Sequence, residues 1–199
     1  IISAIRRFFV ERDFSEVETP ALQISPGIEP HLTAFETDLT EPFRDGESSR
    51  LYLHTSPEFA MKKLLVAGNK RIYQFARCFR NGERSATHHP EFTMLEWYRV
   101  GTDYRALMAD CEALLGAVMA AVPATSLVRG DKRSNLDAEW NYLTVAEAFQ
   151  RDAGIDLLAT APDAGAPSAG LIRAEADRIG VFTSPSDSWE DVFFRIFLA

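Results

Sequence analysis

The alternation of apolar and polar positions is clearest over residues 71–99, and it predicts two β-strands joined by a long polar loop. Successive side chains of a strand point to opposite faces, so each strand has one largely apolar face. The apolar faces carry Tyr73, Phe75 and Phe79 in the first strand and Thr93, Leu95 and Trp97 in the second. The opposite faces carry Gln74, Cys78 and Arg80, and Phe92, Met94, Glu96 and Tyr98. An arginine, a carboxylate, a phenol and an aromatic ring on one face favour a binding floor for a small polar ligand.

The simpler interpretation of this pattern is an antiparallel hairpin with one solvated face. Two features favour the binding floor instead. The polar face mixes aromatic rings with a single arginine and a single glutamate, whereas a wet face usually carries lysine, threonine and serine. The loop over residues 81–90 is also longer than the roughly two to five residues that are usual for hairpins. Its Arg84, His88 and His89 suit a flap that closes on an anion.

The pattern before the hairpin predicts short elements. We expect an amphipathic helix over residues 1–12, strands over 14–17, 32–39 and 51–54, a loop over 23–31 and a polar turn region over 40–49. Pro20 ends the first strand because proline cannot donate to a ladder. Ser56 as a cap, Pro57 at the first helical position and Gly68 at the end predict a second helix.

After the hairpin, the pattern predicts helices separated by linkers. We expect a long helix over residues 103–122 and shorter ones over 143–151, 168–179 and 188–198, with irregular linkers over 124–139 and 159–169. Thr144 and Glu147 have the spacing of a capping box. We therefore divide the chain into a domain over residues 1–122 and a helical and linker region over 123–199.

Composition limits the class of protein. A hydrophobic content of 46% is typical of a globular chain, and a net charge of -8 argues against a protein that mainly coats nucleic acid. The two cysteines, Cys78 and Cys111, have neither the spacing of a metal site nor the density of a disulfide scaffold, which favours a reducing, cytoplasmic location. No run approaches the ~20 apolar residues of a membrane span. Because the chain starts at Ile1, we expect the natural N-terminus to lie upstream.

Two strings of this sequence resemble signature motifs of the class II aminoacyl-tRNA synthetases. RDFSEVETPAL is similar to the first motif, a helix–strand–proline element, and FRNGERSATHHPEFTMLEWY is similar to the second, a strand–loop–strand. The resemblance covers residues 1–122, and the second string is typical of the lysine branch. Within that branch, HTSPEFAMKKLLVAG, HLTAFET and EWYR look more like the ligases that attach β-lysine to elongation factor P.

The resemblance implies an α+β fold, the class II catalytic core, with a six- or seven-stranded antiparallel sheet flanked by helices. It implies ATP-dependent activation of lysine or (R)-β-lysine to an aminoacyl-adenylate and transfer to an acceptor. The acceptor expected is a lysine of elongation factor P, with tRNA(Lys) as the alternative for a lysyl-tRNA synthetase. A homodimer formed through the first motif is also implied.

The resemblance also assigns site residues. Arg80 corresponds to the arginine that contacts the α-phosphate and the substrate carboxylate, and Phe92 to the ring that stacks on adenine. The ATP-binding set implied is Arg80, Asn81, Gly82, Glu83, His88, His89 and Phe92. The amino-acid pocket implied is Ser56, Pro57, Glu58, Glu96 and Tyr98. Within it, Glu58 corresponds to the glutamate that holds the substrate α-amino group, and Ser56 stands where lysyl-tRNA synthetases usually carry alanine.

The sequence departs from the family pattern at three places. Gly82 stands where the glutamate of Arg-x-Glu is usual, so we expect Glu83 to take over the contact with adenine. His89 replaces the usual asparagine, and its ring can still donate to a phosphate. Nothing matches the third motif, near which the family places its Mg²⁺ ligands, so we expect a truncated core that is inactive alone. A non-catalytic amino-acid-binding paralogue is the remaining alternative.

Overall fold

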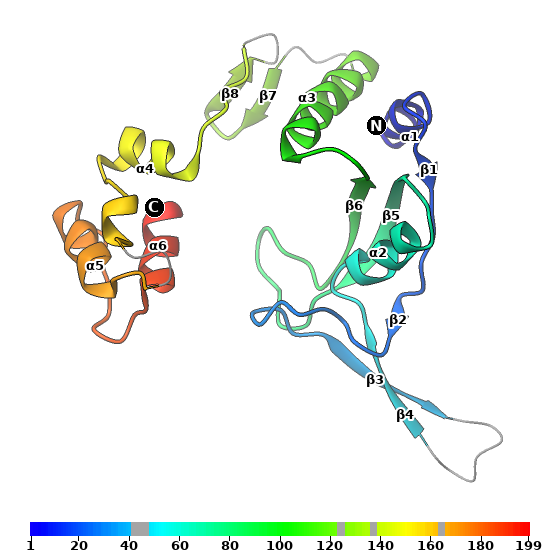
Figure 1. The fold of residues 1–199 in the computed structure, drawn as a ribbon, viewed down its shortest axis with the longest axis horizontal. Helices are drawn as coiled ribbons and strands as arrows, with labels where there is room; N and C mark the ends of the chain where they lie inside the picture. The colour runs from blue at the N-terminus through cyan, green and yellow to red at the C-terminus, as the bar shows by residue number, and fades with distance from the viewer. Residues whose placement is uncertain (41–47, 123–125, 136–138, 163–165) are drawn as a thin grey trace. The chain divides into compact units, whose positions relative to one another are not determined.

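The computed structural model describes residues 1–40, 48–122, 126–135, 139–162 and 166–199 (Figure 1). Its contacts divide the chain into two compact units, Ile1–Asp137 and Ala138–Ala199. Each unit has a hydrophobic core of its own. The units are therefore described one at a time.

The first unit contains three helices and eight strands among its described residues. They are α1 (Ile2–Val10), β1 (Ser15–Glu16), β2 (Leu22–Gln23), β3 (Phe35–Thr40), β4 (Ser48–Leu53), α2 (Glu58–Val66), β5 (Arg71–Phe79), β6 (Glu91–Arg99), α3 (Tyr104–Ala121), β7 (Ser126–Arg129) and β8 (Lys132–Asn135). The α+β class and the antiparallel hairpin with flanking helices are confirmed. The described strands form two three-stranded sheets and one ribbon, where the resemblance implied a single six- or seven-stranded sheet.

The central sheet has the strand order β1-β5-β6. β5 and β6 pair antiparallel over their full length, with Gln74 opposite Glu96 and Cys78 opposite Phe92. Residues directly opposite each other share a face of the sheet, so the predicted division of the hairpin into two faces is confirmed. β1 adds to the outer edge of β5 in parallel, over Ser15 and Glu16 only. The predicted strand over residues 14–17 is thus shorter in the structure.

Helices α1 and α3 cover the apolar face of this sheet. Phe8, Phe9 and Phe14 are buried against Tyr73, and Leu95, Trp97 and Leu114 pack around them. The rings of Phe9 and Tyr73 are stacked with centroids 4.5 Å apart. Arg99 of β6 and Asp110 of α3 form an ion pair of 2.9 Å that ties helix and sheet together. The predicted long helix is confirmed, since Asp103 caps α3 and Val122 follows its last residue.

The second sheet is an extended arm in which β4 pairs with β3 and β2 (Figure 1). Our prediction of a turn region over residues 40–49 is wrong for Thr40 and for Ser48 and Ser49, which belong to paired strands; residues 41–47 lie outside the described part. Most of β3 and the first half of β4 are exposed. The predicted strands over residues 32–39 and 51–54 overlap β3 and β4, and pairing extends these strands to Thr40 and back to Ser48.

Residues 126–135 correct a second prediction. We expected an irregular linker over 124–139, but β7 and β8 form a hairpin closed by Gly130 and Asp131. Gly130 adopts a φ of 62°, which glycine reaches without steric cost. A two-residue glycine–aspartate loop is a known hairpin signal, and it outweighs the polar composition of these strands.

The second unit is helical. It contains α4 (Val145–Ala153), the 3₁₀ turn η1 (Leu158–Thr160), α5 (Ala169–Arg178) and α6 (Trp189–Phe197). Its core consists of Phe149, Ile155, Leu157, Ile172, Ala176, Val192 and Ile196. The predicted capping box of Thr144 and Glu147 is present, and Ser188 with Asp191 forms another. None of the described helices is long and apolar enough to cross a membrane.

Candidate functional site

The polar face of the central sheet is more exposed along β6 than along β5. On β5, the side chains of this face are buried; they are Ile72, Gln74, Ala76 and Cys78. On β6, the facing side chains are partly exposed; they are Phe92, Met94, Glu96 and Tyr98. Glu58 and Lys62 of α2 act electrostatically on Glu96, which places this helix at the same face. The accessible floor therefore lies along β6, beside α2.

Arg80 is the cation at one end of this floor. It follows β5 directly, and its backbone N–H donates to Pro90 O at 2.9 Å, which closes the long hairpin loop. Its Nε donates to the carbonyl oxygen of Thr55 at 3.3 Å, and its guanidinium lies 5.2 Å from the Phe92 ring centroid. Glu83 pairs with its Nη1 at 3.8 Å. The guanidinium is thus anchored through Nε to a backbone carbonyl, while its outer nitrogen Nη1 faces the Glu83 carboxylate.

Glu96 and Tyr98 form a coupled pair further along the strand. The Tyr98 hydroxyl donates to Glu96 Oε1. Burial raises the pKa of the Glu96 carboxyl, while the bond from Tyr98 opposes that change. Burial, followed by the same bond, raises the pKa of Tyr98 above its usual value. A half-buried carboxylate next to a neutral phenol suits a ligand ammonium, which brings the missing counter-charge.

The start of α2 supplies the other predicted pocket residues. The helix begins at Glu58 with Pro57 as its N-cap residue, one residue later than predicted. Ser56 still accepts the Glu58 N–H at 3.4 Å, and Pro57 is fully buried. The Glu58 carboxylate receives the Lys62 ammonium at 2.5 Å. Glu58 also acts electrostatically on Glu96 and Tyr98, so the structure brings these three predicted residues together.

Cys78 is a β5 residue on the same face of the sheet, between Arg80 and the Glu96–Tyr98 pair. It is fully buried opposite Phe92. Burial raises the pKa of its thiol to about 11; the Glu96 charge adds to this and Arg80 opposes it. The thiol is therefore protonated at neutral pH and acts as a small apolar residue.

The loop over residues 80–90 carries the remaining candidates. Asn81 donates its N–H to Thr33 O at 2.7 Å, and Gly82 adopts a φ of 81°, which favours glycine at that position. His89 Nδ1 lies 3.1 Å from Glu91 O. Both histidines are exposed, and their hydrogen bonds stay within the loop and the start of β6. The structure therefore does not bring His88 and His89 into contact with Arg80 or Phe92.

Ser85 fixes the ring of His88. Its hydroxyl accepts the N–H groups of Thr87 and His88 at 3.2 and 3.1 Å. His88 Nδ1 lies 3.0 Å from the same hydroxyl oxygen and 3.1 Å from that of Thr87. Ser85, Lys62 and the Thr55 carbonyl are parts of the site that our sequence reasoning missed; only the i,i+4 spacing of Glu58 and Lys62 gave a signal.

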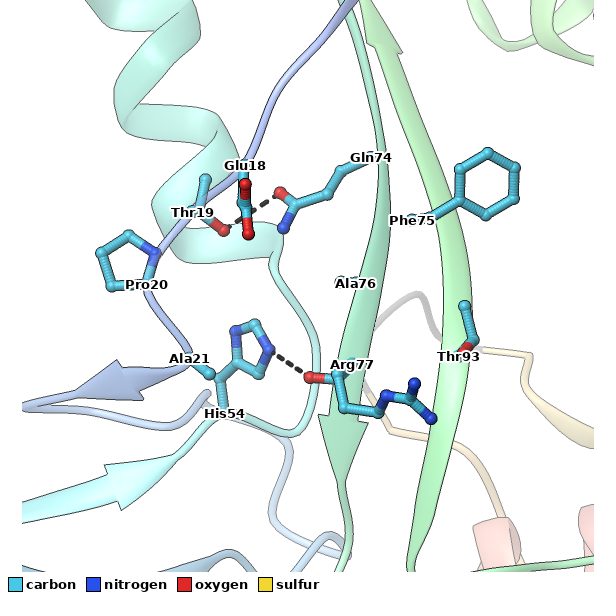
Figure 2. Close-up of a pocket in the computed structure, with 10 residues that line it drawn as sticks. All are labelled: Glu18, Thr19, Pro20, Ala21, His54, Gln74, Phe75, Ala76, Arg77 and Thr93. Atoms are coloured by element: carbon cyan, nitrogen blue, oxygen red, sulfur yellow. Dashed lines mark hydrogen bonds between the residues drawn. The ribbon is translucent and has the colours of Figure 1, made fainter. Parts of the chain in front are cut away.

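A cleft of about 690 Å³ lies away from these residues, between residues 18–21 and the outer edge of β5 (Figure 2). Two hydrogen bonds border it, from Thr19 to Gln74 Oε1 at 3.0 Å and from His54 Nε2 to Arg77 O at 2.8 Å. His54 Nδ1 is buried and has no partner among the described residues. None of the predicted site residues lines this cleft. The described residues also contain no cluster of His, Cys, Asp and Glu that could hold a metal ion.

Comparison with known proteins gives a consistent result. Residues 1–183 match the family model of the class II tRNA synthetases (D, K and N). Several curated proteins named elongation factor P (R)-β-lysine ligase are similar to this chain. The protein of Vibrio parahaemolyticus is 49% identical over 120 residues, which are 60% of this chain and 36% of the relative. That of Pseudoalteromonas translucida is 41% identical over 160 residues, 79% of this chain and 44% of the relative. The chain thus spans less than half the length of these relatives.

Proposed function

Because this chain belongs to the class II tRNA synthetases of the D, K and N group, we propose that the protein activates (R)-β-lysine or lysine with ATP and transfers it to a lysine of elongation factor P. The proposal follows the names of the similar proteins. The observation that carries it is the arrangement of opposite charges at the two ends of the floor along β6. Arg80 lies over Phe92 at one end, and Glu58, Glu96 and Tyr98 gather at the other. An amino acid carries the matching carboxylate and ammonium groups.

The first step forms the aminoacyl-adenylate. A carboxylate oxygen of the amino acid attacks the α-phosphorus of ATP, the bond to the bridging oxygen breaks, and pyrophosphate leaves. Negative charge develops on the α-phosphoryl oxygens during this displacement. The guanidinium fork of Arg80 suits both that group and the substrate carboxylate, so this side chain would stabilise the transition state more than the ground state. The acceptor amine then attacks the activated carbonyl, an amide forms, and AMP leaves.

The ammonium groups of the substrate fit the other end of the floor. We assign Glu58 to the α- or β-amino group and the Glu96–Tyr98 pair to the amino-acid pocket. Ser56 and Pro57 form the wall at the start of α2. The α- and β-isomers differ in the position of one amino group, so a few contacts near Glu58 decide between them, each worth ~1–3 kcal/mol.

The hairpin loop would serve the nucleotide. We assign Phe92 to stacking on adenine. Asn81, Gly82 and Glu83 are assigned to the edge of the same adenine site. We assign His88 and His89 to the phosphates, which their rings would reach once the loop closes over them. Mg²⁺ would accompany the triphosphate and shield its charge; we assign no residue of this chain as its ligand.

Two further properties are part of the proposal. We expect a homodimer formed through α1 and the segment after it, where Ile2 and Val10 expose more than half of their surface. We place the protein in the cytoplasm, because neither Cys78 nor Cys111 forms a disulfide and elongation factors act there.

ATP–pyrophosphate exchange by the protein expressed from its complete gene tests this function. Exchange that prefers (R)-β-lysine over α-lysine, followed by labelling of elongation factor P, is the expected result. Preference for α-lysine with charging of tRNA(Lys) would instead identify a lysyl-tRNA synthetase. Binding of either amino acid without exchange would identify a non-catalytic paralogue.

A further inference from the structure

The two groups that the proposed function assigns to the ends of the substrate already have internal partners. The Glu58 carboxylate receives the Lys62 ammonium at 2.5 Å. The Arg80 guanidinium pairs with the Glu83 carboxylate at 3.8 Å. In each pair, the internal partner has the charge of the substrate group that would replace it. Each of these two charged groups is therefore paired within the chain before a ligand binds.

Lys62 acts on more than one carboxylate of the site. Its charge lowers the pKa of Glu96, against the effects of burial and of Glu58. Lys62 thus acts on both Glu58 and Glu96. These are the two carboxylates of the site nearest to the expected ammonium group. The Lys62 side chain is about half exposed, at 55%, so its ammonium has open solvent into which it can withdraw.

An ordinary helix-surface pair is the simpler explanation. Glu58 and Lys62 are four residues apart in α2, and such pairs change an equilibrium constant by roughly a factor of two. That explanation makes no prediction about ligands. It also gives Lys62 no role at Glu96, which belongs to a different element and lies on the floor of the site.

We propose that Lys62 is a specificity-determining residue, an internal substitute for the substrate ammonium that the incoming amino group must displace from Glu58. This inference rests on the proposed function, since it takes Glu58 as the acceptor of that amino group. Binding exchanges one ion pair for another without any covalent change, and the Lys62 ammonium moves into water. A ligand with an ammonium at the α- or β-carbon loses part of its binding free energy to this displacement. A ligand without one leaves the Glu58–Lys62 pair intact.

The chain contains its own matched control. Lys63 is the next residue of α2, is exposed, and makes no ion pair among the described residues. The changes Lys62→Met and Lys63→Met remove the same charge from the same helix. Any difference between these two variants therefore isolates the contact with Glu58 from the general loss of positive charge.

Calorimetric titration of the protein from its complete gene tests the inference. The ligands are (R)-β-lysine, α-lysine and ε-aminocaproate, which is lysine without its α-amino group. We expect Lys62→Met to tighten binding of the preferred diamino acid by about three- to tenfold, because both the competing pair and the repulsion between two ammonium groups are removed. Lys63→Met should change it by less than about twofold, and neither variant should favour ε-aminocaproate.

Each other result has a definite meaning. If Lys62→Met matches Lys63→Met, weakens binding, or improves ε-aminocaproate equally, the inference is overturned. Lys62→Gln also removes the charge but keeps a polar side chain. It must reproduce the gain in affinity, which then cannot come from the apolar methionine side chain. If the unmodified protein binds neither diamino acid, the proposed function fails and the inference fails with it. Binding by the unmodified protein without the gain overturns the inference alone.

Discussion

Arg80 owes its orientation to a backbone carbonyl rather than to an acid. Its Nε donates to Thr55 O, and Thr55 itself is buried and lies outside the solvent-exposed loop. The Phe92 ring supports the guanidinium from below at 5.2 Å. The Glu83 contact, at 3.8 Å, is long and replaceable. A lysine has neither the planar fork nor the second anchoring nitrogen that this arrangement uses.

The change Arg80→Lys should therefore reduce the kcat of ATP–pyrophosphate exchange by roughly 100- to 1,000-fold, the cost of losing one preorganised donor in a transition state. Arg77→Lys is the matched control, since Arg77 lies near the same end of β5, is exposed, and pairs with Glu91. Loss of activity within threefold for Arg80→Lys would contradict the role assigned to its guanidinium.

Glu96 makes folding stability depend on pH. Burial raises its pKa above the ordinary value of 4.5, so the folded protein favours the protonated form. This carboxyl therefore stabilises the fold fully below pH 4.5 and loses that contribution as the pH rises through the raised value. The change Glu96→Gln should raise the free energy of unfolding at neutral pH, and the difference should vanish in acid.

Urea unfolding at pH 7 and pH 4 measures this effect. Glu91→Gln is the control, because Glu91 belongs to the same strand and is exposed. A gain for Glu96→Gln that persists unchanged in acid would mean that burial does not penalise its charge. The same variant should bind diamino acids more weakly, so stability and affinity are expected to move in opposite directions at this position.

Helix α3 depends on its first turn. Asp103 accepts the N–H groups of Arg105 and Ala106 at 3.0 and 3.3 Å. These groups have no partner inside the helix, so the change Asp103→Ala should lower the free energy of unfolding by about 1 kcal/mol. Asp103→Asn keeps an accepting oxygen and should cost less than half of that. Equal losses for the two variants would show that the charge matters more than the cap.

Helix ends were the part of the fold that the sequence predicted best. Asp103, Thr144 and Ser188 each bond to backbone N–H groups within three residues, so the whole signal is local. Strand pairing is different. The polar strands β3, β4, β7 and β8 have no buried face, and their pairing depends on distant or turn-closed partners that alternation does not report. Tertiary pairing thus overrode local composition at Thr40, Ser48 and Ser49 and in β7 and β8, where we expected a turn region and a linker.

The site divides in the same way. Alternation along β6 correctly placed Phe92, Glu96 and Tyr98 on one face, because the period of a strand is fixed by its backbone. The burial of Gln74 and Cys78 on the facing strand was not predictable, since it depends on which elements cover β5. The carbonyl of Thr55 beside Arg80 carried no sequence signal at all, as any residue supplies a carbonyl.

The two units should lose their structure independently, because each buries a separate set of apolar side chains. In the second unit, Ile172 is fully buried at the centre of the core. Truncation to alanine removes buried methyl groups and leaves a cavity, at a cost of about 2–5 kcal/mol. A unit of this size has little stability in reserve, so the change Ile172→Ala should unfold much of it.

Hydrogen exchange followed by mass spectrometry measures the two units separately. Ile172→Ala should speed exchange in α4, α5 and α6 and leave the β5–β6 hairpin as slow as in the unmodified protein. Leu171→Ala is the control, since Leu171 is 47% exposed in the same helix and its truncation leaves no cavity. Faster exchange in β5 and β6 would mean that the units unfold as one. Unchanged exchange there would mean that the floor along β6 and Arg80 keep their structure when the helical unit is lost.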